Sequence, residues 1–179
     1  MKRTSFVSLG LVVFMASLAA AASIHMKIDH SVPTFFDLGT DLRASGELAG
    51  LANEALTVDL VTTGNPTATC HNPGNDANLP PGQNPAPVQL TGTESITPDA
   101  ISKNGNAPFS VDAVLASATV EGAPDCPNPN WIETITDVAF TSATVTVTQG
   151  SNTFTVTCTF NPPTSDGLVP AKNVSCTTS

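Results

Sequence analysis

The stretch "TFTVTCTF", Thr153–Phe160, alternates apolar and polar side chains without a break. One face carries Phe154, Val156, Cys158 and Phe160, and the other carries Thr alone. This period of two predicts a strand with one buried face, and β-branched Thr suits the exposed face. The stretch therefore predicts a β-sheet protein with its core on the Phe and Val side.

Similar patterns lie on both sides of this strand. A turn at 149–152 connects it to "ATVTVTQ" (143–149), which follows "WIETITDVAF" (131–140). In the latter we expect one shared face from Ile132, Thr134, Thr136, Val138 and Phe140. Earlier strands are predicted at 55–70, 88–96 and 109–115, with the Asn104-Gly105 turn before the last one. Short strands separated by turns predict an all-β fold, an antiparallel immunoglobulin-like β-sandwich.

The chain divides into three predicted parts. Residues 1–22 combine Lys2 and Arg3 with an apolar run that ends in small residues, which predicts a cleaved signal peptide. Residues 23–50 are predicted as an N-terminal segment leading into the domain, and residues 51–179 as the sandwich. A helix over "ELAGLANEAL" (47–56) is the alternative to a turn and a strand, but Gly46 and Gly50 disfavour it.

Charge excludes several classes of partner. The chain has 6 basic and 15 acidic residues, for a net charge of −9. Loss of Lys2 and Arg3 with the leader would leave 4 basic residues against 15 acidic ones, a net charge of −11. Such a chain repels nucleic acid and anionic lipid. No second long apolar run follows the leader, so we expect no membrane insertion. The leader predicts a secreted, extracellular protein, and we expect it to be a monomer.

The four cysteines are Cys70, Cys126, Cys158 and Cys176. An even number in a secreted chain predicts two disulfides, and three pairings are possible. We favour Cys158–Cys176, which would tie the tail to the predicted sheet at a gain of about 3 kcal/mol. That choice leaves Cys70 for Cys126.

Cys70 and Cys126 each open a Cys-x-Asn-Pro loop, "CHNPGN" (70–75) and "CPNPNW" (126–131). A disulfide would bring both loops to one rim of the sandwich. The candidate binding residues on that rim are Asn72, Pro73, Gly74, Asn128, Pro129, Asn130 and Trp131. Trp131, the only Trp, has two alternative roles: packing behind the Cys126 bond, or contacting a ligand.

Metal chemistry has weak support. Cys70, His71 and Cys126 lack the ligand spacing of zinc sites. Cleavage after Ala22 would expose Ser23-Ile24-His25, a sequence that can bind Cu(II), but His25 and His30 fit an ordinary N-terminal segment better. We assign no metal ligand and no cofactor.

The sequence gives equally little support for a catalytic site. No Gly-x-Ser-x-Gly motif is present. Glu133 and Asp137 would share a strand face about 13 Å apart, too far for a glycosidase pair. Asp59 and Asp112 could lie near one another on adjacent strands, but the sequence does not show that they do. We therefore assign no catalytic residue. Asn173-Val174-Ser175 is a glycosylation sequon, relevant only in a eukaryotic secretory pathway.

The segments "NPAPVQLTG" (84–92), "KNG" (103–105), "CPNPNW" (126–131) and "ITDVAFTSATVTV" (135–147) carry a resemblance. Over roughly residues 50–160, the chain resembles a widespread group of small secreted fungal and bacterial proteins with a Cys-Pro-Asn-Pro-Asn-Trp signature. The group lends no enzymatic activity and no residue roles. Cysteine-stapled secreted proteins of fungi include effectors and elicitors of plant immunity, so the resemblance implies such a function only by analogy.

Three functions are therefore carried forward. The first is a non-enzymatic secreted interaction protein, an apoplastic effector or elicitor whose partner is a host cell-surface protein or a cell-wall component. The second is a passive structural or wall-associated domain. The third is a secreted copper- or carboxylate-dependent enzyme.

Overall fold

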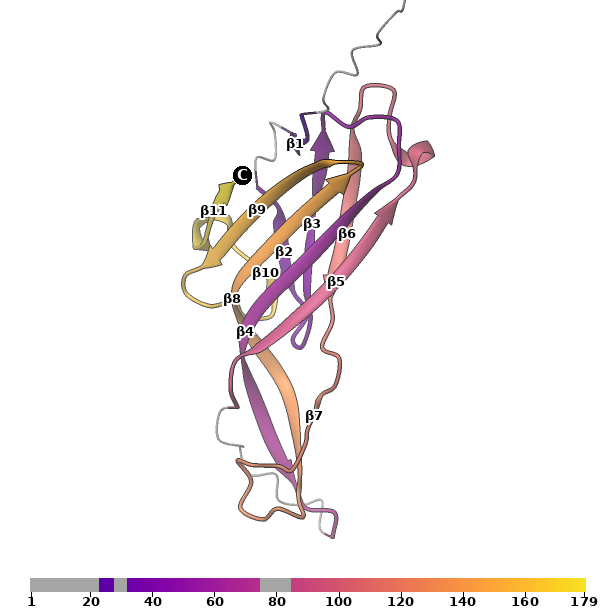
Figure 1. Cartoon of the computed structure of the whole chain (residues 1–179). Coiled ribbons are helices and arrows are strands. Elements are labelled where there is room, and N and C mark those ends of the chain that lie inside the picture. Colours follow the sequence, from indigo (N-terminus) through magenta and orange to yellow (C-terminus); the bar gives the residue numbers. More distant parts are fainter. Residues whose placement is uncertain (1–22, 28–31, 75–84) are drawn as a thin grey trace, which may run out of the picture.

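Two antiparallel sheets make up the protein, as Figure 1 shows. The computed structural model describes residues 23–27, 32–74 and 85–179, so the expected signal peptide and His30 lie outside the described residues. The first sheet contains β1 (His25–Met26), β2 (Thr34–Asp37), β3 (Leu42–Ala49), β6 (Ala107–Ala113) and β10 (Gly167–Leu168). The second contains β4 (Leu56–His71), β5 (Val88–Ile96), β7 (Thr119–Val120), β8 (Ile132–Gln149), β9 (Asn152–Phe160) and β11 (Val174–Thr178). Short 3₁₀ turns, η2 (Pro98–Ala100) and η3 (Ala171–Asn173), complete the described elements. The predicted all-β antiparallel sandwich is confirmed.

The N-terminal segment supplies three of the strands in the first sheet. β3 pairs with β1 and β2 on one side and with β6 on the other. Leu42, Ala44 and Leu48 alternate into the core, so the region that includes "ELAG" is a strand and the helical alternative is wrong. β1, β2 and β3 thus belong to the sandwich itself, although the sequence predicts that this domain begins at residue 51.

The core lies between the two inner faces. Phe35 of β2 packs edge-on against Phe160 of β9, with ring centroids 5.0 Å apart. The inward residues predicted for "TFTVTCTF" behave as expected at Val156, Cys158 and Phe160, which are buried. This burial supplies the main apolar stabilisation of the sandwich.

One side of the sandwich is closed by a very close approach of β5 to β6. Thr91 of β5 bridges Val114 just after β6, and Glu94 accepts a hydrogen bond from the Ser110 backbone N–H at 2.7 Å. A Cβ atom on Gly92 would lie 1.9 Å from the Asp112 carbonyl oxygen. Only glycine permits this approach.

The β4–β8 ladder extends beyond the sandwich. Pairing runs from Thr57 opposite Thr148 to His71 opposite Ile132, with two shifts of register on the way. In Figure 1 the far half of this ribbon runs away from the two sheets, with β7 at its side. We call residues 66–74 and 117–137 the arm, and its far end the tip.

Two β-bulges in β8 shape the ribbon. The register shifts at Thr63/Gly64 and at Thr67/Ala68, which leaves Thr141 and Thr136 as the extra residues of β8. Each extra Thr donates its hydroxyl to a β4 carbonyl, Thr141 to Thr63 at 3.1 Å and Thr136 to Thr67 at 3.2 Å. The side chains thus bond to backbone oxygens at the two points where the ladder is interrupted.

The bulges overturn one expectation about faces. Ile132, Thr134 and Thr136 do not share the inward face of Val138 and Phe140. Ile132 is 42% exposed, while its neighbour Glu133 is fully buried. The physical reason is the extra residue at Thr136, which reverses the alternation between the arm and the sandwich.

Replacing Gly92 with Ala should lower the free energy of unfolding by about 2–3 kcal/mol, because the new methyl group must displace the β6 backbone. Urea unfolding is the measurement. Ser95→Ala, an exposed change on the same strand, is the control and should leave stability nearly unchanged. Equal stability of the Gly92→Ala and wild-type proteins would contradict the close approach.

Candidate functional site

Both favoured disulfides are present. Cys70 bonds to Cys126 across 56 residues of chain, with a Cα–Cα distance of 5.7 Å. Cys158 bonds to Cys176, its direct cross-strand neighbour between β9 and β11. The zinc hypothesis at Cys70, His71 and Cys126 is therefore wrong, because both sulfurs are bonded to each other and neither is a thiolate.

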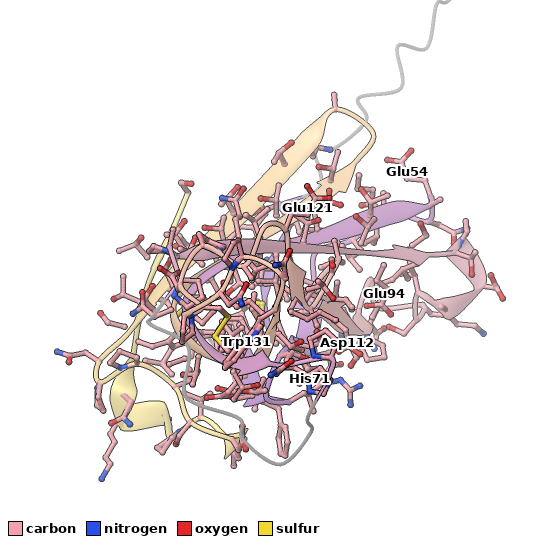
Figure 2. All side chains as sticks on the ribbon, turned by 90° about the horizontal axis from the view of Figure 1, so that it is seen from below. Glu54, His71, Glu94, Asp112, Glu121 and Trp131 are labelled. Carbon is pink, nitrogen blue, oxygen red and sulfur yellow. A yellow bond between two sulfur atoms is a disulfide. The ribbon has the colours of Figure 1, made fainter. Side chains whose placement is uncertain are left out.

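The Cys70–Cys126 bond lies in the arm. Cys70 is near the end of β4, and Cys126 belongs to the segment between β7 and β8 that folds over the ribbon. Figure 2, which looks at the molecule from below, shows Trp131 and His71 at this end. The described residues of the two Cys-x-Asn-Pro loops thus lie together, at the tip of a projecting ribbon and not on the rim of the sandwich.

The two loops make the same local turn. The Asn72 Oδ1 atom accepts a hydrogen bond from the Gly74 backbone N–H at 3.0 Å. In the second loop the Asn128 Oδ1 atom accepts one from the Asn130 backbone N–H at 2.9 Å. An Asn side chain that caps a backbone N–H two residues ahead is an Asx turn, and Pro at the middle position fits it. The repeated Asn-Pro pair therefore has a conformational cause.

Most of the predicted binding residues are open to solvent. Pro73, Gly74, Asn128, Pro129 and Asn130 are exposed. Asn72 and Trp131 are half-buried, so Trp131 neither joins the core nor stands as a fully exposed platform. The Trp131 backbone N–H closes the second turn by donating to the Asn128 carbonyl at 3.0 Å. The two loops can therefore present a rigid polar surface with the Trp131 ring at one side. That this surface binds a partner stays a prediction.

Glu133 was considered from the sequence only as half of a catalytic pair, and its burial in the arm was not predicted. It lies opposite Cys70 in the β4–β8 ladder and opposite Val120 of β7. Its side chain is fully buried, and its Oε2 atom accepts a long hydrogen bond from the Asp125 backbone N–H at 3.4 Å. Its Oε1 atom has no hydrogen-bond partner among the described residues. Only knowledge of the Thr136 bulge would have placed this carboxylate inside.

A second candidate site joins the sandwich to the base of the arm. Carboxylate oxygens of Asp37, Asp137 and Asp166 all lie within 4.8 Å of one another, the one group of this kind among the described residues. Asp37 is buried, and it accepts hydrogen bonds from the Gly39 backbone N–H at 2.9 Å and from the Thr164 hydroxyl. Burial raises the pKa of Asp37, and the nearby charges of Asp137 and Asp166 raise it further. Oxygen ligands in this arrangement can hold a hard cation.

The carboxylate pairs considered for catalysis do not meet. Glu133 is buried in the arm, whereas Asp137 belongs to the three-carboxylate group. Asp59 accepts a hydrogen bond from Thr93 on the second sheet, and Asp112 forms a bidentate pair with Arg43 on the first. The hydrogen bonds from Arg43 lower the pKa of Asp112 below its ordinary value.

The structure describes two of the histidines considered as metal ligands, His25 and His71. The His25 ring Nδ1 lies 2.6 Å from the Ser23 carbonyl oxygen, and His25 pairs with Ala49 in the first sheet. His71, the last residue of β4, is half-buried opposite Ile132. Neither position contributes to a group of three metal-type ligands within the described ranges.

The outer face of the second sheet carries a regular array of hydroxyl groups. The registers of five neighbouring strands place these side chains in rows across the sheet. The members are Ser175 and Thr177 of β11, Thr153, Thr155, Thr157 and Thr159 of β9, Ser142, Thr144, Thr146 and Thr148 of β8, Thr57 and Thr63 of β4, and Thr91, Thr93 and Ser95 of β5. Asp59 is the charged residue within these rows. We call this surface the hydroxyl face.

Asp166→Asn should stabilise the protein at neutral pH by a few tenths to about 1 kcal/mol and should have little effect at pH 3. Because the native pKa of Asp37 is raised above its ordinary 3.8, this group favours folding in acid and its contribution is lost as the pH rises through the native pKa. Removing the Asp166 charge reduces that loss. Urea unfolding from pH 3 to 8 measures the effect, and an equal gain at all pH values would contradict the carboxylate repulsion.

No protein-family model, curated protein or solved structure matches this chain. The described residues contain no helix long and apolar enough to cross a membrane. Two disulfides indicate an oxidising, extracellular environment.

Proposed function

We propose that the protein is a secreted, non-enzymatic recognition protein that acts outside the cell as an effector or elicitor at a host interface. The observation that carries this proposal is the arm, which holds two Asx turns, tied by one disulfide, away from the main core. The partner would be a host cell-surface protein, and the tip would be the contact surface.

Rigidity supports recognition by the tip. The Cys70–Cys126 bond and the two Asn side-chain bonds restrict the loops before any partner arrives. A pre-ordered surface avoids much of the entropy cost of binding. Trp131 at its edge belongs to the residue types that most often dominate binding energy.

The extracellular setting is supported by independent features. Two disulfides persist in oxidising compartments, and the expected leader at residues 1–22 would direct export. The resemblance to small secreted proteins with the Cys-Pro-Asn-Pro-Asn-Trp signature points the same way.

The test is infiltration of the purified oxidised protein into leaves, with the oxidative burst and cell death recorded. The double variant Cys70→Ser/Cys126→Ser should need at least a tenfold higher dose, because its tip loops lose their common tie. Cys158→Ser/Cys176→Ser removes the other disulfide from the edge of the sandwich, and it should keep the response. Full activity of a folded tip variant would overturn tip recognition, and no response to the wild-type protein in several plants would overturn the elicitor function.

The hydroxyl face favours a second candidate, a wall-associated domain that adheres to polysaccharide. Rows of Thr and Ser offer donors and acceptors that match sugar hydroxyls. Asp59 is the charged residue among these rows, although the chain as a whole has 15 acidic residues against 6 basic ones.

Pull-down on insoluble cell-wall polymers tests this candidate. Thr144→Glu/Thr157→Glu places two charges on cross-strand neighbours of the hydroxyl face and should reduce the bound fraction at least fivefold. Thr34→Glu/Ser45→Glu makes the same change on cross-strand neighbours of the first sheet and should bind as wild type. Equal binding by all three proteins would contradict adhesion through the hydroxyl face.

A further inference from the structure

The tip contains a small open cavity. Its volume is about 390 Å³, and it is lined by Pro124, Asp125, Cys126 and Pro127. Asp125 and Cys126 are half-buried, and the two prolines are exposed. The cavity therefore opens beside the disulfide, on the segment that folds over the ribbon.

A buried acid, Glu133, is hydrogen-bonded to one of the residues that line this cavity. Asp125 connects the two, because it lines the cavity and its backbone N–H faces the Glu133 Oε2 atom at 3.4 Å. The Glu133 Oε1 atom is buried and has no partner among the described residues. Buried polar atoms without a partner are rare in native proteins, and such an atom commonly marks the place of a missing ligand or ion.

The described part of the arm has no lysine or arginine to pair with this acid. Its acidic residues include Glu121, Asp125 and Glu133, its one basic side chain is His71 at the end of β4, and the sequence has no Lys or Arg between Arg43 and Lys103 or between Lys103 and Lys172. A permanently charged ammonium or guanidinium group at the tip would have to come from a binding partner. Attraction between a buried carboxylate and a nearby cation is stronger than in water, because the surroundings have a lower dielectric constant.

We propose that the tip cavity binds the ammonium group of a lysine side chain on the partner. The Asp125 carboxylate and the Glu133 carboxylate behind it would provide the negative charge, and the two prolines would contact the aliphatic stem. Ammonium is a compact charge with three donors and needs no planar, paired acceptor. This inference rests on the proposed recognition by the tip and specifies its partner chemistry.

The test is an NMR titration of the ¹⁵N-labelled mature protein with the peptide acetyl-Gly-Lys-Gly-amide. Amide signals of Asp125 and Cys126 should shift, and the same peptide with an acetylated lysine side chain should cause no shift. Glu133→Gln should weaken binding at least fivefold. Glu121→Gln removes one charge from an exposed acid of the same arm and should change affinity less than twofold.

Three results would overturn the inference. The first is equal weakening by Glu133→Gln and Glu121→Gln, which would indicate general attraction to an acidic arm. The second is the same shift with the acetylated peptide, and the third is no shift with either peptide. If Glu133→Gln disturbs the arm, seen as shifts throughout residues 117–137, Asp125→Asn replaces it with the same expected loss. If the titration fails while the Cys70→Ser/Cys126→Ser protein loses its leaf response, the lysine inference is overturned and the recognition function stands.

Discussion

The pairing of β4 with β8 is the constraint on which the rest of the molecule depends. β4 alternates inward and outward residues from Leu56 to His71 without interruption. Its first half faces the sandwich core, and its second half carries the arm. Because one hydrogen-bonded ladder runs through both parts, the tip is positioned by the sheet and not by a flexible linker. The candidate recognition surface thus takes its geometry from the same strands that build the core.

The arm has only a small interior of its own. Its buried residues are Pro66, Ala68, Cys70, Ala123, Glu133 and Ile135. Such an interior gives little apolar stabilisation. The Cys70–Cys126 bond therefore contributes much of the stability that holds the segment between β7 and β8 against the ribbon. Ala123 reaches its buried position with a φ of 40°, a left-handed backbone that is costly for alanine. The disulfide and the ladder together can compensate for that strain.

Much of the fold follows from patterns visible in the sequence. The period of two predicts β9 and β6, and glycines 105 and 150 mark turns where φ is positive. The Cys158–Cys176 pairing follows from the strand that carries Cys158 and the tail beside it, and the Cys70–Cys126 pairing then follows by elimination. The bulges at Thr136 and Thr141 do not follow, because a Thr that bonds to a partner-strand carbonyl looks like any other Thr in a Thr-rich strand. The candidate residues of the tip could be predicted from the two Cys-x-Asn-Pro repeats. The burial of Glu133 could not, because it depends on a bulge. The contact of Asp37 with Asp137 and Asp166 depends on the tertiary fold, and local patterns carry no signal for it.

The bulge at Thr136 also sets a rule for how the length of this chain can vary. Loss of one residue between Ile132 and Val138 would restore simple alternation along β8. Ile132 would then turn inward beside the disulfide, and Glu133 would turn out to water. The sandwich would keep its core, while the side chains of β8 in the arm would exchange their buried and exposed faces. Insertions and deletions at the surface loops change a protein gradually, but here a single codon separates two different tips on one scaffold.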